Sequence, residues 1–384
     1  MEFLHTSDWH LGRFFHQVSL LDDQALLLQQ LVDHLAARPP AALIIAGDVY
    51  DRSVPPAEAV ALLDGFLDQV LGELKIPVLM IPGNHDSAER LGFAARHLHQ
   101  AGLHIFSDLR RVDQPVTLQE DGLCVDFYGL PYADPQQVRE VFADELKPDQ
   151  RLDFNQAHTF LVDKIRRAWQ PDRKRVLISH CFLDGASESS SERSLSIGGA
   201  DRVDWQPLQG FDYVALGHLH SPQYKGAEWI RYCGSLMQYS FSEVNQRKGV
   251  LRVCLTADAP ARVELQELRP RRALRRIEGR LDDLLEQGRT DPANEDYLLV
   301  CLEDRQALLN PLARLREVYP GVLHLERKKL APDGTPGARG ERLKRDELAL
   351  FDDFFRQTRD EPLSDEQKTL LGEVIEQARK EEQA

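Results

Sequence analysis

Asn84, His85 and Asp86 are the side chains in this sequence with the clearest capacity for chemistry. They offer, in order, a neutral oxygen, a titratable ring and a carboxylate, groups that bind metals or move protons. They follow the apolar run Ile76–Met80, which predicts a short buried β-strand, and Gly83, which permits a sharp turn. In open α/β sheets, sites lie at the carboxyl ends of strands. Because turns also favour Asn and Asp for backbone reasons, the triplet must be compared with other strand ends.

Four further predicted strands end in residues of the same chemical kinds. They carry Asp8 and His10 after Glu2–Ser7, Asp48 after Ala41–Ala46, His180 after Arg175–Ser179, and His218 and His220 after Asp212–Leu216. Two members of a pair that lie two residues apart point to the same side of an extended segment. A lone histidine at a strand end is more often structural than a ligand. Five coincident strand ends are hard to explain in that way.

The candidate ligands are imidazole, carboxylate and amide groups, with no thiolate among them. This mixture suits borderline to hard divalent ions such as Mn²⁺ and disfavours a thiolate zinc site. Seven ligands would oversupply one ion. Two ions about 3.5–4 Å apart, bridged by one carboxylate, fit the count and match the arrangement used for phosphate ester hydrolysis.

The elements that must position these strand ends alternate between strand and helix. Leucine spacing predicts a helix over Asp22–Ala37, and a second helix of about Pro56–Leu74 leads to the strand before Asn84. Two strand–helix–strand crossovers in succession predict a layered α/β domain. Further helices are expected over Ser87–Gln100 and Asp153–Trp169, and further strands over Val116–Leu118 and Leu123–Gly129.

The second half of the chain changes in pattern. Strands and turns from Trp229 to Leu268 are interpreted as a second sheet packed on the first. The segment Gly185–Ala200, rich in Ser, Glu and Gly, is either a mobile loop near the site or a solvated linker.

We divide the chain into residues 1–268 (the main domain), 269–330 (a small α+β capping unit), 331–340 (a linker by its Pro and Gly content) and 341–384. The capping unit is expected to hold a helix at Asp282–Gln287, a strand at Tyr297–Leu302, a helix at Ala307–Tyr319 and a strand at Val322–Glu326. Two C-terminal helices are expected at about Asp346–Arg359 and Asp365–Lys380, the second with a Ser364–Gln367 capping box.

Composition narrows the class of protein. The 384 residues suggest two or three domains, and a formal net charge of −15 argues against a surface coated in basic residues. Five cysteines without a Cys-x-x-Cys pair fit a reducing cytoplasm. Asp8 comes too early for a cleaved signal peptide to precede it, and no apolar run is long enough to span a bilayer. A P-loop sequence is lacking, so ATP binding of that kind is not expected.

The strand-end motifs Asp-x-His, Gly-Asp-x-x-Asp, Gly-Asn-His-Asp, a lone His and Gly-His-x-His, in this order, resemble the calcineurin-like metallophosphoesterases. The neighbouring strings are similar to the DNA nuclease branch of that family, whose members work with a coiled-coil ATPase. Those strings are Ser7–Gly12, Gly47–Asp51, Pro82–Ser87, Tyr232–Ser235 and Ser240–Glu243. The resemblance covers the whole length and implies a layered β-sandwich flanked by helices, with a small α+β cap and a C-terminal helical hairpin.

The resemblance also implies roles. Asp8, His10 and His220 hold one Mn²⁺, Asn84, His180 and His218 hold the other, and Asp48 bridges both; Mg²⁺ is an alternative metal. His85 approaches the phosphate, stabilises developing charge and protonates the leaving oxygen. Asp86 orients His85 or a ligand. Some relatives carry a second functional histidine where this chain has Asp51, which leaves the role of Asp51 open.

DNA and protein partners follow from the same resemblance: double-stranded and hairpin DNA, a homodimer paired through the predicted helices Pro56–Leu74 and Ser87–Gln100, and the ATPase in a heterotetramer. Candidate DNA contacts are Arg271, Arg272, Arg275, Lys328 and Lys329, and candidate contacts with the ATPase are Phe351, Phe354, Phe355, Leu370 and Leu371. The alternatives are a solvated charged face for the basic residues and packing on their own domain for the helices.

Two other functions stay open: a phosphoesterase of small nucleotides or phosphoproteins, and a scaffold with a purely structural metal. His85 argues against the scaffold because the fold does not need its proton.

Overall fold

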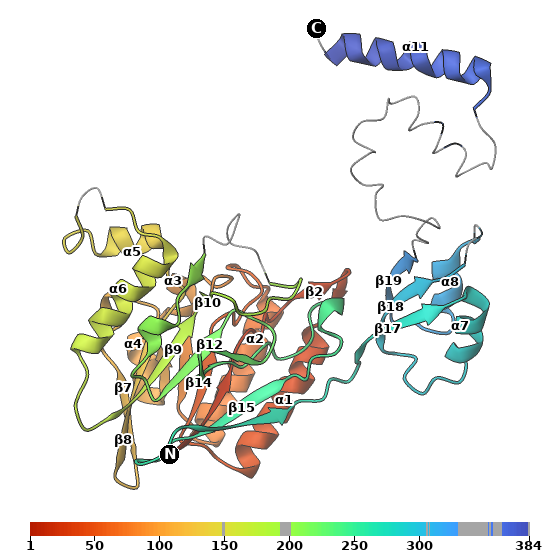
Figure 1. Cartoon of the computed structure of the whole chain (residues 1–384). Helices are drawn as coiled ribbons and strands as arrows, with labels where there is room; N and C mark the ends of the chain where they lie inside the picture. The colour runs from red at the N-terminus through yellow and green to blue at the C-terminus, as the bar shows by residue number, and fades with distance from the viewer. Residues whose placement is uncertain are drawn as a thin grey trace. The chain divides into compact units, whose positions relative to one another are not determined.

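The computed structural model of the chain describes residues 1–147, 150–192, 201–304, 306, 308–328, 352, 355 and 363–382 (Figure 1). The chain divides into two units, Met1–Arg327 and Lys328–Ala384, and each is described by itself. The first unit contains two six-stranded sheets and a separate three-stranded sheet. Within the described residues, no helix is both long and apolar enough to cross a membrane.

The first large sheet has the strand order β16-β15-β1-β4-β5-β6. Its strands are β1 (Glu2–Thr6), β4 (Ala42–Ala46), β5 (Val78–Ile81), β6 (Leu103–Ile105), β15 (Gly249–Cys254) and β16 (Arg262–Glu267). Strands β1, β4, β5 and β6 run parallel, whereas β15 and β16 add an antiparallel edge. Every residue of β4 and β5 is buried, which is why these strands appear in the sequence as continuous apolar runs.

The second large sheet has the order β13-β14-β12-β9-β8-β7. Its strands are β7 (Val116–Glu120), β8 (Leu123–Leu130), β9 (Lys174–His180), β12 (Tyr213–Gly217), β13 (Gln223–Lys225) and β14 (Ala227–Tyr232). The four central strands, β14, β12, β9 and β8, are parallel. The strands from Trp229 to Leu268 therefore do not form a second sheet of their own. That interpretation was wrong because β15 and β16 extend the first sheet while β14 belongs to the second.

The two sheets face each other across a common core. Phe3, Ile44 and Leu79 from the first sheet pack with Phe127 and Tyr213 from the second, and all five are fully buried. The Phe3 ring meets those of Phe127 and Tyr213 edge to face, at centroid distances of 5.4 and 5.7 Å. This inner layer is the β-sandwich expected from the sequence.

Helices cover the outer faces of the sandwich (Figure 1). The first sheet packs against α1 (Leu21–Ala37) and α2 (Ala57–Leu67), and α2 continues into a π-helical turn, Asp68–Glu73. The second sheet packs against α5 (Pro135–Val141) and α6 (Phe154–Arg167), and Asp153 and Gln156 form a capping box at the start of α6. The predicted helices near residues 22–37 and 153–169 are confirmed.

The helix expected over Ser87–Gln100 is broken. The segment forms two short helices, α3 (Ala88–Leu91) and α4 (Ala95–Leu98), and a 3₁₀ turn, His99–Ala101. The break follows from Ala94, whose φ of 58° lies in the left-handed region and ends the first helical run.

The smaller elements of the first unit complete the connections. They are the strands β2 (Phe14–Phe15), β3 (Val18–Ser19), β10 (Phe182–Leu183) and β11 (Arg202–Val203), and the 3₁₀ turns Leu109–Arg111, Gln206–Leu208 and Phe241–Glu243.

A three-stranded sheet with two helices follows residue 268, in the region predicted to be a small α+β capping unit. We refer to it as the cap, and its role in capping DNA stays a prediction. It consists of β17 (Leu274–Gly279), β18 (Tyr297–Leu302) and β19 (Val322–Arg327), all parallel, with α7 (Leu281–Gly288) and α8 (Pro311–Arg316). Strand β17 was not predicted because its arginines hide the pattern of a strand. Helix α8 is shorter than expected, since Asn310 has a φ of 45° and Pro311 begins the helix.

In the second unit, α11 (Asp365–Glu382) begins at the predicted capping box. The Gln367 backbone N donates to Ser364 Oγ at 3.3 Å, and the Ser364 N donates to Gln367 Oε1 at 2.9 Å. The Leu363 N also donates to Asp352 Oδ1 at 2.9 Å. Most of the first C-terminal helix predicted at Asp346–Arg359 lies outside the described residues.

Candidate metal centre

The seven predicted ligands come from both large sheets and meet at one edge of the sandwich. Strands β1, β4 and β5 deliver residues from the first sheet, and β9 and β12 deliver residues from the second. The loops interlock: Asp8 N donates to Gly47 O at 3.0 Å, and His10 N donates to Asp48 O at 2.9 Å. Six of the seven side chains are at most 4% exposed, namely Asp8, His10, Asp48, His180, His218 and His220, and Asn84 is half-buried.

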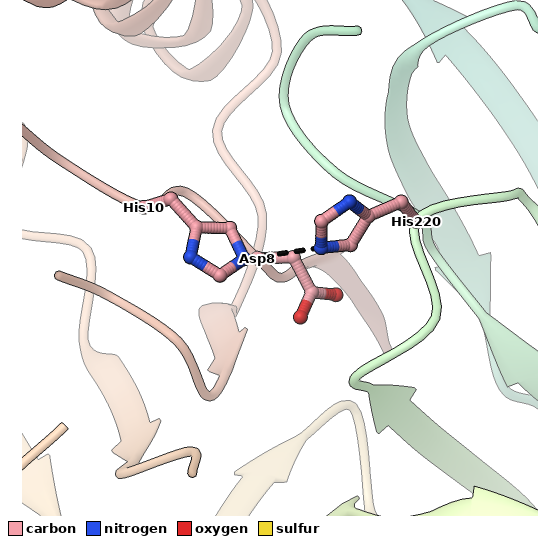
Figure 2. A group of neighbouring side chains, drawn as sticks. All are labelled: Asp8, His10 and His220. Atoms are coloured by element: carbon pink, nitrogen blue, oxygen red, sulfur yellow. Dashed lines mark hydrogen bonds between the residues drawn. The ribbon is translucent and has the colours of Figure 1, made fainter. Parts of the chain in front are cut away.

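Asp8, His10 and His220, which we call the first ligand set because they are predicted to hold one ion, lie close together (Figure 2). One potential ligand atom from each lies within 4.8 Å of the others. The Nε2 atoms of His10 and His220 point at each other and are 3.0 Å apart. Two imidazole nitrogens and a buried carboxylate aimed at one space are suited to a cation.

Asn84, His180 and His218 form the second set. Asn84 Oδ1 lies 3.0 Å from His180 Nε2 and 2.9 Å from His218 Nδ1. His180 keeps its other nitrogen, Nδ1, 2.9 Å from the carbonyl oxygen of Ala46. That carbonyl fixes the tautomer that leaves Nε2 free to act as a ligand.

Asp48 lies between the two sets. Its Oδ2 is 3.7 Å from His10 Nε2 and 3.5 Å from His180 Nε2, so one carboxylate faces a member of each set. Its Oδ1 accepts a hydrogen bond from the His85 backbone N at 2.8 Å. This is the position that a bridging carboxylate would occupy.

The backbone that carries these ligands is not extended. Asp8, His10, Asp48 and His218 have φ values of 53°, 46°, 48° and 100°. The expectation that Asp8 and His10 share one side of an extended segment was therefore wrong, because both residues sit in left-handed turns. Such conformations cost roughly 1–3 kcal/mol each and persist only where the surrounding structure enforces them.

His85 lies beside the centre and is held by the loop after β4. Its Nδ1 is 2.9 Å from the Asp51 carbonyl oxygen, and its ring centroid is 4.7 Å from that of His10. The Asp51 carboxylate lies 3.6 Å from His10 Nδ1 and 3.5 Å from Arg13 Nη1. Asp51 thus contacts His85 through its backbone and faces His10 through its side chain.

Asp86 was expected to orient His85 or a ligand, and its contacts favour the second alternative. Its carboxylate accepts hydrogen bonds from the backbone N of Val49, Tyr50 and Gly83, at 2.9 to 3.0 Å. These bonds tie the loop after β5 to the loop that carries Asp48. Burial, together with Asp48, raises the pKa of Asp86 to about 6.

The electrostatics of the centre are those of a cation site. Burial alone would raise the pKa of Asp48, but the His180 and His10 rings hold it well below its ordinary value. Burial raises the pKa of Asp8 to about 6 and lowers that of His218 to about 3. His10 Nδ1 and Asn84 Nδ2 are buried without a hydrogen-bond partner. Oxygen and imidazole donors, with no thiolate, fit a divalent cation.

The predicted DNA contacts are distributed unevenly. Arg271 is exposed. Arg275 forms ion pairs with Asp291 and Asp296, at 2.9 and 2.7 Å, so its guanidinium is already engaged inside the cap. Arg272 donates to the Tyr297 hydroxyl at 3.2 Å and lies 3.7 Å from Asp23. Lys328 is described and Lys329 lies outside the described residues.

The predicted contacts with the ATPase lie in the second unit. Leu370 is 65% exposed on α11, and Leu371 beside it is half-buried. Phe355 is half-buried, whereas Phe351 and Phe354 lie outside the described residues.

Sequence reasoning assigned no role to several residues that contact the centre. Gln24 on α1 donates through Nε2 to the carbonyl oxygens of Trp9 and His10, at 3.0 and 2.8 Å. Ser191 and Glu243 reach His220 from its outer side. Of the two alternatives for the serine-rich segment, residues 185–192 thus correspond to a loop at the site. No signal in the sequence could have predicted these contacts, because they join residues that are far apart in the chain.

Comparisons with known proteins identify the family of the chain. A family model described as calcineurin-like phosphoesterase matches residues 1–222, and one described as the C-terminal domain of a type 5 capsule protein repressor matches residues 270–359. The chain is 32% identical over 375 residues to the SbcD component of the nuclease SbcCD from Staphylococcus epidermidis, and the match covers 98% of each chain.

Two solved structures are also similar. A protein of Thermus thermophilus is 16% identical, with a TM-score of 0.39, over 70% of this chain and 99% of its own. A dimetal phosphatase from Danio rerio is 12% identical, with a TM-score of 0.40, over 69% of this chain and 98% of its own.

A proton should compete with a cation for His180. Burial alone would lower the pKa of His180, but Asp48, with Asp8, raises it to about 9, so the ring is charged below that pH in the metal-free protein. Cation uptake at pH 7.5 should therefore release a proton, and affinity should fall about tenfold for each pH unit below 9. Isothermal titration in buffers of different ionisation enthalpy measures both quantities. Uptake without proton release would contradict this assignment.

Proposed function

The chain belongs to the calcineurin-like phosphoesterase family, and on that premise we propose that it is the nuclease subunit of an SbcCD-type complex. In this proposal it hydrolyses phosphodiester bonds of DNA, as a double-strand exonuclease and as an endonuclease on single strands and hairpins. The observation that carries the proposal is the meeting of seven metal-binding side chains at one edge of the sandwich, with His85 beside them. The 32% identity to a known nuclease component directs the choice of substrate towards DNA.

The proposed cofactors are two Mn²⁺ ions, with Mg²⁺ as an alternative. Asp8, His10 and His220 would hold one ion, Asn84, His180 and His218 the other, and Asp48 both. Bound divalent cations would supply positive charge that polarises the phosphate and lowers the pKa of water. The strained loops would keep the ligands from collapsing onto one another before a cation binds.

His85 is the proposed proton donor. Its Nδ1 faces the Asp51 carbonyl oxygen, which can only accept, so Nδ1 must carry a proton. A second proton on Nε2 makes the ring an imidazolium, and that proton is the one available to a leaving oxygen. The Asp48–His85 backbone hydrogen bond fixes the residue beside the ligands.

The rival function within enzymes is hydrolysis of small nucleotides or phosphoproteins, and the rival from another class is a scaffold with a structural metal. The cap, which carries exposed Arg271, supports a large anionic substrate. The deciding experiment incubates the purified protein with blunt duplex, hairpin DNA and a small phosphodiester, each with Mn²⁺, Mg²⁺ or chelator. Cleavage of the small ester alone would favour the first rival, and no cleavage at all would favour the second.

The proposed assembly is a homodimer joined to the SbcC ATPase in a cytoplasmic heterotetramer. Exposed leucine and valine side chains on α11 support docking of a partner there, with Leu370 65% and Val374 56% exposed. The five cysteines are free thiols, which suits a reducing compartment.

The first test separates metal binding from proton transfer. His85→Gln should retain both cations and lose turnover by about 10²-fold or more, because it removes the proton donor and no ligand. Asp48→Ala should lose cations, because that carboxylate faces both sets. Metal analysis and the small-ester assay on the same preparations measure both effects, with the exposed histidine variant His99→Gln as the control. Wild-type turnover in His85→Gln would contradict the role given to His85.

The second test concerns the dimer. Val60 on α2 and Phe93 between α3 and α4 are 43% and 80% exposed, in the region expected to pair. Val60→Asp with Phe93→Asp should shift the protein from dimer to monomer, because a charge cannot be buried there without a partner. Light scattering over a range of concentrations measures this shift. Phe14→Asp, at another exposed ring, should leave the dimer intact. A wild-type protein that is monomeric at high concentration would exclude the interface.

The third test concerns the ATPase. Leu370→Asp with Val374→Asp places charge one turn apart on α11 and should abolish capture of SbcC. Since the ligands all lie between Asp8 and His220, Mn²⁺-dependent hydrolysis of the small ester should remain. Glu366→Gln, in the first turn of the same helix, is the control for capture. If the double variant still co-purified with the ATPase at full yield, the docking surface would lie elsewhere.

A further inference from the structure

His220 is held at three of its polar atoms by residues that do not belong to either ligand set. Its backbone N donates to Glu192 Oε1 at 2.8 Å, and its carbonyl oxygen accepts from Lys248 Nζ at 2.6 Å. Its ring Nδ1 lies 2.6 Å from Ser191 Oγ. The ring and backbone of one proposed metal ligand therefore depend on the serine loop, which we define as residues 185–192, and on Lys248.

The hydrogen-bond directions follow from the chemistry of each atom. Nε2 of His220 faces His10, so Nδ1 is the outer nitrogen. Ser191 Oγ donates to Glu243 Oε1, a carboxylate that can only accept when ionised. Ser191 Oγ must then accept from Nδ1–H of His220. This chain, from ring to hydroxyl to carboxylate, selects the tautomer with a free lone pair on Nε2.

Glu243 is a suitable end for that chain because its charge is secured. The side chain is fully buried, and its Oε2 forms an ion pair with Lys248 Nζ at 2.6 Å. It also accepts from Ser189 Oγ at 3.1 Å and from the Tyr239 backbone N at 3.3 Å.

The other histidines of the centre are held differently. His180 uses the Ala46 carbonyl oxygen, which is part of β4 and cannot leave without unfolding the strand. His220 instead relies on a side chain of the serine loop, and the loop is attached from outside by Arg13 Nη2, which donates to Ser191 O at 3.0 Å. Arg13 in turn lies 4.9 Å above the Tyr239 ring.

We propose that Ser191 and Glu243 are positioning residues for His220, and that the serine loop completes the metal position formed by Asp8, His10 and His220. The inference rests on the two-metal function proposed above. When the loop is in place, the ring of His220 has one tautomer and one orientation. When Ser191 is lost, Nδ1 loses its acceptor at 2.6 Å, and the next one, Glu243 Oε1, lies 3.6 Å away, beyond hydrogen-bond distance. The ring can then rotate or change tautomer, and one cation binds more weakly while the other is unaffected.

The test is a titration of the full-length, metal-free protein with Mn²⁺, followed by calorimetry and by the electron paramagnetic resonance of free Mn²⁺. Wild type should bind two ions. Ser191→Ala should bind one ion with wild-type affinity and the other about 10–100-fold more weakly, the usual effect of removing such an outer partner. Ser191→Thr, which keeps the hydroxyl, should restore the affinity. Ser190→Ala is the matched control, since Ser190 lies in the same loop but its Oγ bonds Ser240 and Ser242, not His220.

Glu243→Gln is the second variant and should weaken the same ion, because it removes the charge that orients the Ser191 hydroxyl. Thermal unfolding in chelator separates a positioning role from a structural one: Ser191→Ala should unfold at the wild-type temperature. Two ions bound with wild-type affinity by Ser191→Ala, or an equal loss in Ser190→Ala, would overturn the inference and leave the proposed function standing. A wild type that binds no Mn²⁺ would overturn both.

Discussion

Two carboxylates, Asp8 and Asp48, are buried where the edges of two β-sheets meet, and this constraint governs the rest of the structure. A buried carboxylate is costly unless positive charge or hydrogen-bond donors compensate it. Here the compensation in the metal-free protein is one ion pair, between Asp48 and His180, and backbone donors such as His218 N, which reaches Asp8 Oδ1 at 2.9 Å. Burial lowers the pKa of His10 well below its ordinary value and that of His218 to about 3, so these two rings offer nitrogen ligands without adding charge.

The fold tolerates this concentration of polar groups because the backbone around them is closely fitted. A Cβ on Gly83 would collide with Asp48, and one on Gly217 would collide with the Ala46 carbonyl oxygen and approach His180. The glycines of the Gly-Asn-His and Gly-His-x-His motifs thus lie where the backbone of one segment packs directly against residues 46–48. Their small size lets strands from opposite sheets bring ligands together, and the left-handed turns at Asp8, His10 and Asp48 aim those ligands inward.

The sequence was sufficient to identify the polar side chains that meet at one edge of the sandwich and to predict most elements, because both depend on local pattern. Buried parallel strands are continuous apolar runs, and β4 and β5 were recognised in that way. The sequence was insufficient where two paired segments are far apart in the chain. Strand β15 pairs with β1 across some 250 residues, and the periodicity of neither segment indicates this pairing. The prediction also missed the helix break at Ala94 and the strand β17, for a related reason. An alanine in the left-handed region and a strand rich in arginine both contradict local preference. The contact of Ser191 with His220 was missed because it too joins residues that are distant in the chain.

Two of the arginines after residue 268 have partners inside the protein, and their proposed contact with DNA stays a prediction. Arg275 is neutralised by Asp291 and Asp296, and Arg272 lies against Tyr297, whose hydroxyl donates to Asp23 Oδ2 on α1 at 2.7 Å. These contacts hold the cap together and attach it to the helix that covers the first sheet. The next residue of that helix, Gln24, holds the carbonyl oxygens of Trp9 and His10. Neighbouring residues of α1 therefore support the cap on one side and the loop of two proposed metal ligands on the other. The position of the cap and the geometry of the candidate metal centre consequently share one element, helix α1.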